Sequence, residues 1–244
     1  MECYNEGDSF GLERIIMRYP DCISGEFISR PNRFIAQVRT GDAIETVHVK
    51  NTGRCRELLL PGSRVTLAAS GNPNRKTKYD LISVYKDGLG WVNIDSQIPN
   101  ALVLDWLKQG STPFPDLTLL RPEYTFGESR IDFYLKCEGG RKILMEVKGC
   151  TLERQRQGWF PDAPTARGTK HLRELTRAVA DGWECCIAFV IAMPGVVSVL
   201  PNRETDPGFA EAFDLARESG VKTLLLPCSV QPDAIEITGW QLLP

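Results

Sequence analysis

The chain has 244 residues, of which 42% are hydrophobic and 25% are charged, and its formal net charge is −2 at pH 7. These values are ordinary for a globular protein, and the length allows one large domain or two moderate domains, each with its own core. The sequence contains no apolar run long enough to span a membrane, no secretory signal and no Cys-x-x-Cys pair, which argues against a membrane protein, an exported protein and a zinc site.

Residues 1–19 are predicted to be an N-terminal extension, and residues 20–88 a small all-β domain. Short runs rich in β-branched and aromatic residues alternate there with turn-forming residues, as in RFIAQVRT followed by Gly41-Asp42. Five strands at this spacing are typical of a small closed barrel, of which the OB-like barrel is one example.

The predicted barrel concentrates positive charge. Between Arg30 and Lys86 there are 11 lysine and arginine residues against 4 aspartate and glutamate residues, and both flanking segments are acidic. Cations carried by turns reach phosphates rather than base edges, so we expect sequence-nonspecific, salt-sensitive binding to DNA or another nucleic acid. A solvated cationic surface without a partner would have the same composition. The candidate nucleic-acid-binding residues are Arg30, Arg33, Arg54, Arg56, Arg75, Lys76 and Lys78.

Residues 89–244 are predicted to form an α/β domain. Helical and strand patterns alternate along this segment, which indicates helices layered on a sheet. Gly110 and Gly220 are predicted helix stops, and Thr165 is a predicted N-cap. In chain order, the predicted elements are a helix over 98–109, strands over 116–126, 129–136 and 142–148, a helix within 165–180, a strand over 185–192, a helix over 209–218 and a strand over 221–226.

Charged residues on the middle strands predict a metal site. Successive side chains of a strand point to opposite faces, so Glu146 and Lys148 share a face. Asp132 lies on the preceding strand, and a hairpin would bring it within about 5 Å of Glu146 at Cβ. Two such carboxylates repel unless a cation lies between them, and Mg²⁺ (or Mn²⁺) with water and phosphate in its remaining positions would meet that need. Lys148 would then orient an attacking water or stabilise charge on the phosphate.

Three further residues are candidates for the same site. Glu123 is a possible third metal ligand, and a helix packed beside the strands would bring Lys170 or His171 toward a scissile phosphate, with His171 active in proton transfer. Each has an ordinary alternative, since a Glu-x-Lys pair, a strand-edge acid and a polar helix face are usually solvated surface groups. The catalytic candidates are Asp132, Glu146, Lys148, Lys170 and His171, and the candidate metal ligands are Asp132, Glu146 and Glu123.

The order acid, Asp, Glu-x-Lys after a helix resembles the PD-(D/E)xK nuclease superfamily, and a longer part of the chain resembles the sugar fermentation stimulation protein A family. The resemblance implies an α/β (α+β) fold in which a small OB-like barrel precedes a PD-(D/E)xK restriction-endonuclease-like domain, with DNA binding and an inferred nuclease activity. It also implies an acidic cluster at Glu123, Asp132 and Glu146 beside Lys148, although no literal Pro-Asp pair precedes Asp132. The matching runs, between Arg30 and Leu175, are RFIAQV, NTGRCRELLLPGS, RKTKYDLI, SRIDFYL, MEVKGCTL and FPDAPTARGTKHLREL.

Several functions remain open from the sequence. The first is a metal-dependent nuclease that binds DNA. The second is a non-catalytic DNA-binding accessory or regulatory protein, for sugar metabolism by the family's name, that uses the nuclease-like fold as a scaffold. The third is a barrel that binds a small ligand or a protein. The scattered cysteines favour free thiols in a reducing cytoplasm, and no feature predicts an oligomeric state.

Overall fold

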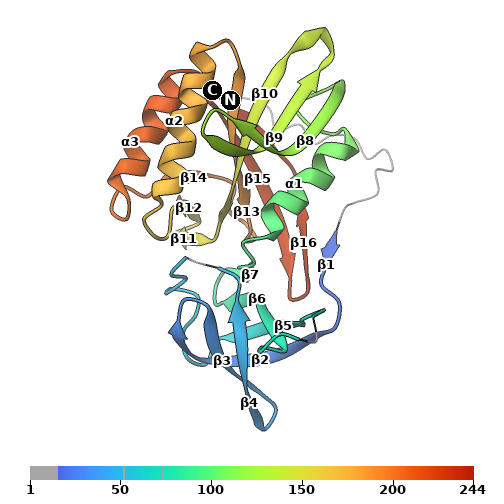
Figure 1. The fold of residues 1–244 in the computed structure, drawn as a ribbon. Helices are drawn as coiled ribbons and strands as arrows, with labels where there is room; N and C mark the ends of the chain where they lie inside the picture. Colours follow the sequence, from blue (N-terminus) through green and yellow to red (C-terminus); the bar gives the residue numbers. More distant parts are fainter. Residues whose placement is uncertain (1–15, 52, 73) are drawn as a thin grey trace.

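The computed structural model describes residues 16–51, 53–72 and 74–244. This part of the chain forms two lobes, a β-barrel and a larger α/β body that stands on it (Figure 1). Among these residues, no helix combines the length and the apolar character needed to cross a bilayer.

The first lobe is a closed five-stranded, OB-like barrel. Its strands follow the order β4-β3-β2-β5-β6, and a parallel pairing of β4 with β6 closes the ring. Strand β7 continues the sheet beyond β6, so the lobe runs to Asn93, past the predicted boundary at residue 88. The strands are β2 (Cys22–Asn32), β3 (Ile35–Thr40), β4 (Ala43–Val49), β5 (Arg64–Ala69), β6 (Tyr79–Lys86) and β7 (Gly90–Asn93).

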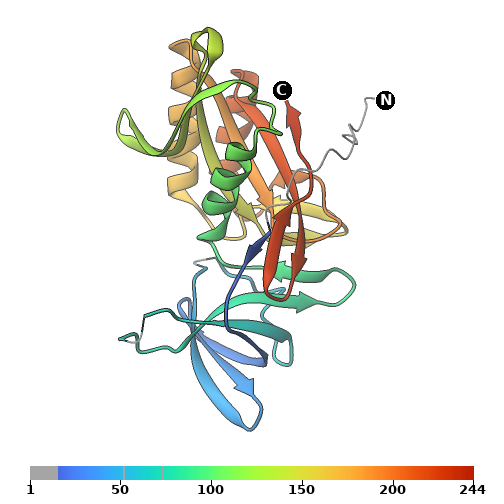
Figure 2. The ribbon, with the colours of Figure 1, turned by 90° about the vertical axis from the view of Figure 1, so that its right-hand side faces the viewer.

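Alternation along the strands forms the barrel core. In β3, Ala36 and Val38 are fully buried and Arg39 is exposed, as expected for a strand with one face inward. Strand β6 departs from this pattern, because residues 80–84 are buried on both faces. Its outer face is covered by the β15–β16 hairpin of the second lobe, which reaches down to the barrel (Figure 2), and Ser83 Oγ donates to the Pro232 carbonyl at 2.6 Å.

The second lobe is built on an eight-stranded sheet. Its order is β1-β16-β15-β13-β10-β9-β8, with β17 also paired to β15. Strands β10, β13 and β15 are parallel, whereas β8 and β9 form an antiparallel extension. The strands are β1 (Met17–Arg18), β8 (Leu117–Phe126), β9 (Ser129–Cys137), β10 (Lys142–Cys150), β13 (Glu184–Ile191), β15 (Lys222–Gln231), β16 (Ala234–Ile237) and β17 (Gln241–Leu243). A small separate sheet holds β11 (Leu152–Arg154), β12 (Gln157–Phe160) and β14 (Val199–Pro201), and a short 3₁₀ turn, η1, spans Glu138–Gly140.

Three helices cover this sheet. Helix α1 (Ile98–Gln109) packs on one face, and α2 (Ala166–Ala180) and α3 (Pro207–Glu218) pack on the other (Figure 1). The predicted helix signals are present. Helix α1 ends at Gly110 with a φ of 84°, and Thr165 caps α2 by accepting from the Gly168 N–H at 3.1 Å. The predicted α/β layer arrangement is confirmed.

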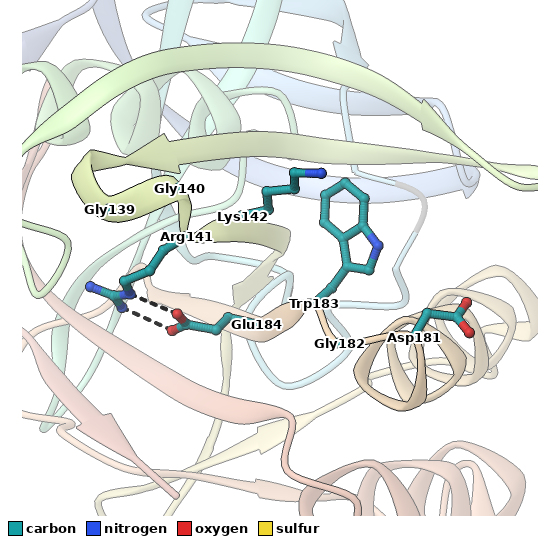
Figure 3. Close-up of a pocket in the computed structure, with 8 residues that line it drawn as sticks. All are labelled: Gly139, Gly140, Arg141, Lys142, Asp181, Gly182, Trp183 and Glu184. Carbon is teal, nitrogen blue, oxygen red and sulfur yellow. Dashed lines mark hydrogen bonds and ion pairs between the residues drawn. The ribbon is translucent and has the colours of Figure 1, made fainter.

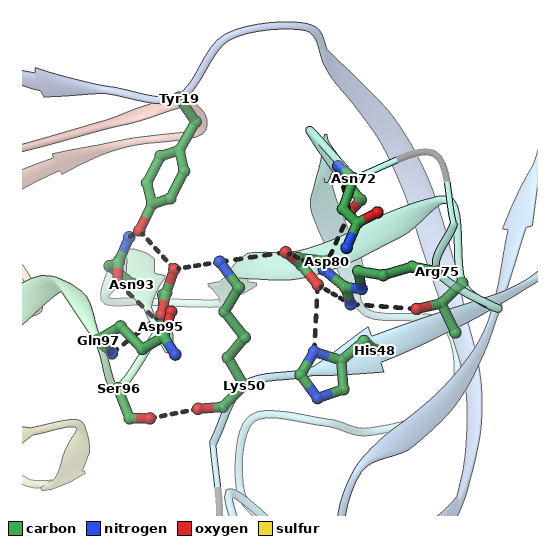
Figure 4. Close-up of polar contacts among 12 residues, drawn as sticks. Tyr19, His48, Lys50, Asn72, Arg75, Asp80, Asn93, Asp95, Ser96 and Gln97 are labelled. Atoms are coloured by element: carbon green, nitrogen blue, oxygen red, sulfur yellow. Dashed lines mark hydrogen bonds and ion pairs between the residues drawn. The ribbon is translucent and has the colours of Figure 1, made fainter.

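A buried ionic network ties the barrel to the segment that leads into α1 (Figure 4). The Lys50 ammonium lies 3.1 Å from Asp80 Oδ2 on β6 and 3.3 Å from Asp95 Oδ2 after β7. The Asp80 and Asp95 side chains are 6% and 1% exposed, so both carboxylates depend on neighbouring cations and donors. Arg75 also pairs with Asp80, and the Tyr19 hydroxyl donates to Asp95. Lys50 is the cation that the two carboxylates share.

We expect Lys50→Met to lower the free energy of unfolding by about 3 kcal/mol, because the two carboxylates would stay buried without their shared counter-ion. Urea unfolding measures this change. Lys136→Met, at an exposed lysine of β9, is the control and should change stability by less than about 0.5 kcal/mol. Equal stability of the two variants would contradict the structural role given to Lys50.

Candidate active site

Strand β10 directs Glu146 and Lys148 toward α2. Leu144 belongs to the core cluster that contains the α2 residues Leu172 and Leu175, whereas Met145 and Val147 pack with α1. Because side chains alternate along a strand, Glu146 and Lys148 lie on the α2 face with Leu144. The two charges therefore lie inside a layered structure, between the sheet and a helix.

Glu146 is a buried carboxylate with one unused oxygen. Its Oε1 accepts from Lys148 Nζ at 2.5 Å and from His171 Nδ1, whereas Oε2 is buried without a hydrogen-bond partner. Burial by itself raises the pKa of Glu146, but the hydrogen bond from His171 and the charge of Lys148 outweigh it and hold the pKa below its ordinary value. Glu146 is therefore ionised, with an acceptor oxygen available to a ligand.

Asp132 lies where β9 parts from β10. The last paired rung of the hairpin is Met145 opposite Phe133, and one residue further on the Asp132 carboxylate accepts from the Val147 N–H at 2.7 Å. Its other oxygen accepts from Asn100 Nδ2 on α1 at 2.8 Å. Burial and the neighbouring charge of Glu146 raise the pKa of Asp132. The two carboxylates therefore repel each other, and the nearby charge of Lys148 offsets part of this effect on the pKa of Asp132.

His171 joins this cluster from the first turns of α2 as a partner of Glu146. Its side chain is 5% exposed, and Arg167 Nε lies 3.5 Å from His171 Nε2. A guanidinium cannot accept a hydrogen bond, so Nε2 accepts and Nδ1 carries the hydrogen donated to Glu146. The geometry makes His171 a group that orients Glu146, whereas the sequence predicted proton transfer at the phosphate.

Two candidates do not reach the cluster. Glu123 has a φ of 54°, and its carboxylate, 63% exposed, pairs with Arg130 on the neighbouring strand. Lys170 is exposed and donates to the Glu128 carbonyl at 3.0 Å. The structure therefore does not bring Glu123 or Lys170, predicted as a metal ligand and a catalytic residue, into the cluster with Asp132 and Glu146. Within residues 16–51, 53–72 and 74–244, no group of three or more His, Cys, Asp or Glu residues is placed to hold a metal.

The residues that remain still suit one hard cation. Mg²⁺ is commonly held by one or two carboxylates, with water and substrate phosphate completing the shell. Asp132 and Glu146 supply two carboxylates, and the unpartnered Glu146 Oε2 is an acceptor for which no described residue provides a donor. These two residues would hold the ion.

Two of the predicted phosphate-binding arginines have structural roles. The Arg30 guanidinium donates to the carbonyls of Asn51 and Arg33, each at 2.6 Å, and to those of Gly53 and Arg54, so it clamps the loop after β4. Arg75 pairs with Asp80 at 2.7 Å. Both guanidinium groups are therefore engaged by groups of the barrel itself.

The other predicted cations are exposed. Arg33 lies 4.9 Å from the centre of the Phe34 ring, whose side chain is also exposed. For the remaining four, no side-chain hydrogen bond or ion pair joins them to any residue of the described part. These are Arg54, Arg56, Lys76 and Lys78.

The loop with Arg54 and Arg56 docks against the second lobe. Between the two arginines, the Cys55 N–H donates to Asp162 Oδ2 at 3.2 Å. Asp162 belongs to the loop that precedes α2, the helix that carries His171. Two free cations of the barrel are therefore fixed next to the loop that leads into the candidate site.

Gly53 makes this docking possible. A Cβ built on Gly53 would lie 2.3 and 2.5 Å from the two Asp162 carboxylate oxygens. We expect Gly53→Ala to displace Asp162, break its bond to Cys55 and lower the free energy of unfolding by about 1–2 kcal/mol. Gly71→Ala, where an added Cβ meets nothing within 4 Å, is the matched control for chemical denaturation. An equal effect of both substitutions would contradict the docking role of Gly53.

A shallow pocket of about 380 Å³ lies away from these residues, at the N-terminal ends of β10 and β13 (Figure 3). There the guanidinium of Arg141 pairs with Glu184 and the Lys142 ammonium lies over the Trp183 ring, 5.3 Å from its centre. The pocket holds none of the predicted site residues.

Two family descriptions match the chain in succession. The SfsA N-terminal OB domain matches residues 28–94, and the sugar fermentation stimulation protein RE domain matches residues 97–234. The chain belongs to the sugar fermentation stimulation protein family. The division between the two matches falls where strand β7 ends and helix α1 begins.

Members of the sugar fermentation stimulation protein family resemble the chain over nearly its whole length. A homolog from Desulfitobacterium hafniense is 50% identical over 220 residues, 90% of this chain and 95% of the relative. A homolog from Ruminiclostridium cellulolyticum is 47% identical over 221 residues, 91% and 96% of the two chains. The solved structure of Pyrococcus furiosus SfsA in complex with Ca²⁺ has a TM-score of 0.83 at 28% identity, covering 92% of this chain and 96% of that one. The two-lobed architecture is therefore shared with that relative.

Proposed function

We propose that this chain binds DNA without sequence preference and hydrolyses phosphodiester bonds at Asp132, Glu146 and Lys148 with Mg²⁺ or Mn²⁺. The observation that carries the proposal is the buried Glu146, with one oxygen unpartnered, beside a second carboxylate and an ammonium. An unpartnered buried oxygen is unfavourable unless a ligand supplies the missing contact. A bound cation would supply it and would also relieve the repulsion between the two acids.

The chemistry of the ligands favours a hard divalent cation. Carboxylate oxygens select hard divalent ions, and the cluster contains no thiolate to favour a softer metal. The relative from Pyrococcus furiosus has been solved in complex with Ca²⁺, which is itself a hard, oxygen-seeking ion. This supports a hard-cation site in the family.

Each residue of the cluster has a distinct part in the proposed reaction. When bound, the metal would polarise the phosphate and acidify a water molecule. The Lys148 ammonium, 15% exposed, would donate to a phosphate oxygen as negative charge develops. His171 fixes Glu146, and the Val147 N–H fixes Asp132, so the two carboxylates keep their orientation before substrate arrives.

The nucleic acid is proposed to run from the barrel loops past the loop that precedes α2 to the candidate site. Arg54 and Arg56 are fixed by the Cys55–Asp162 contact beside the loop that leads into α2. Lys76 and Lys78 would extend the contact along the barrel. Exposed turn cations of this kind bind the phosphate backbone of any sequence.

The direct test is a calorimetric titration with Mn²⁺, combined with cleavage assays on plasmid and single-stranded DNA. Wild type is expected to bind Mn²⁺ and to cleave DNA only with added metal. Asp132→Ala should lose both properties by at least about 10²-fold. A pure wild-type protein that binds no metal and cuts neither substrate would show that the enzymatic part of the proposal is wrong.

A second candidate is a DNA-binding accessory or regulatory protein without turnover. The observation that favours it is that two carboxylates, rather than three, converge in the described cluster, since Glu123 lies elsewhere. Such a protein would bind DNA with wild-type affinity after Glu146→Gln and would cleave nothing with either metal. Cleavage that is lost in Glu146→Gln while DNA affinity persists would favour the enzyme instead.

A further inference from the structure

The first turn of α1 lies unusually close to the candidate site. A Cβ built on Gly149, the residue after Lys148, would lie 2.9 Å from Pro99 Cγ. Only a glycine at this point of β10 lets the helix approach so closely. Asn100, which follows Pro99 in α1, directs its side-chain amide at Asp132, with Nδ2 donating to Oδ1 at 2.8 Å.

The barrel also holds the start of the first turn of α1, through Asp95. Asp95 Oδ1 accepts from the Gln97 N–H at 3.0 Å, and the Asp95 carbonyl accepts from the Ile98 N–H, so Asp95 holds the two residues at which α1 begins. The other oxygen of Asp95 is held by Lys50 of the barrel at 3.3 Å (Figure 4). Asn100 is thus anchored from the barrel through Asp95.

From this geometry we propose that Asn100 is a positioning residue for the metal ligand Asp132; the inference rests on the proposed metal site. Asp132 is held from two sides. The Val147 N–H holds Oδ2, and Asn100 holds Oδ1. Each oxygen retains a second lone pair, so a carboxylate locked in this way can still coordinate a cation. Without Asn100, only the Val147 N–H would hold the Asp132 carboxylate, and Oδ1 would have to be ordered when the metal binds.

Groups that orient a metal ligand typically change metal affinity 10–100-fold when they are removed. The test is a titration with Mn²⁺ in the absence of DNA. Binding is monitored by calorimetry and by the electron paramagnetic resonance signal of the free ion. Asn100→Leu keeps the size of the side chain and removes the donor, and Asn100→Ala removes the donor without adding apolar bulk. Both are expected to raise the Kd for Mn²⁺ about 10-fold or more at unchanged DNA affinity.

The control separates positioning from helix stability. Leu104→Ala truncates a half-buried leucine of α1 that packs on the core formed with Met145 and Val147 and has no hydrogen-bonding group to offer Asp132. It should therefore lower the unfolding temperature and leave the Kd for Mn²⁺ unchanged. Wild-type Mn²⁺ affinity in both Asn100 variants would overturn this role of Asn100. Equal weakening by Leu104→Ala would also overturn it, because helix stability would then explain the effect. Absence of Mn²⁺ binding in wild type would instead overturn the proposed function itself.

Discussion

Lys148→Met is expected to reduce DNA cleavage by about 10²–10³-fold while leaving Mn²⁺ binding intact. Methionine keeps the apolar stem and removes the ammonium, which is the group proposed to stabilise charge on the phosphate. Metal affinity should hold or improve, since Glu146 Oε1 then loses a cation that competes for it. Single-turnover cleavage rates at saturating DNA, measured alongside Mn²⁺ titrations, separate these two effects.

Lys170→Met is the matched control for this experiment. Lys170 is a lysine of the same region that the sequence also suggested for catalysis, yet its ammonium contacts the exposed Glu128 carbonyl. Its replacement should change the cleavage rate by no more than about 2-fold, in line with the small effects of exposed polar contacts. A rate in Lys148→Met equal to that of Lys170→Met would contradict the catalytic role of Lys148.

Reversing the charge of the four free barrel cations is expected to weaken DNA binding by at least about 10²-fold and to flatten its salt dependence. If each cation neutralises one phosphate, the slope of log K against log salt becomes shallower by about 0.9 per cation for duplex DNA. The variant combines Arg54→Glu, Arg56→Glu, Lys76→Glu and Lys78→Glu. Fluorescence anisotropy at several salt concentrations gives both quantities.

A charge-matched variant tests whether the location of the cations, rather than the net charge of the chain, determines DNA binding. Reversing four exposed lysines of the α/β lobe changes the net charge by the same amount but leaves the barrel loops untouched. These are Lys108, Lys136, Lys142 and Lys222. If both variants lose affinity equally, net charge alone explains the binding, and the assignment of the interface to the barrel is wrong.

The sequence predicts the fold where local signals and tertiary structure agree. The periodicity of α2, its Thr165 cap and the apolar runs of β13 and β15 are strong local signals. Helix α2 and strand β13 formed close to their predicted limits, whereas β15 begins as predicted but continues past residue 226 to Gln231. The short strands β11, β12 and β14 were not predicted, since strands of three or four residues form through pairing with distant segments rather than through their own pattern. Strand β1 pairs with β16, which joins the end of the predicted extension to the second lobe; the remainder of that extension, residues 1–15, lies outside the described residues.

The candidate site shows the same limit at single residues. Glu146 and Lys148 share a face because strand alternation requires it, so their placement follows from sequence. The placement of Glu123 does not follow, because its backbone has a φ of 54°, a left-handed conformation that a strand pattern does not predict. Arg30 looks like any exposed turn cation, and its internal role depends on backbone carbonyls that lie about twenty residues away in the chain. No pattern marks Asn100, whose partner Asp132 is 32 residues distant.

The central claim, that Asp132 and Glu146 converge on one divalent cation, is tested most directly by a crystal structure of the wild-type chain grown with Mn²⁺. We expect one anomalous peak between the two side chains, with Glu146 Oε2 and an Asp132 oxygen both coordinating the ion directly. A fully occupied ion bound elsewhere, with the two carboxylates turned away from each other, would contradict it.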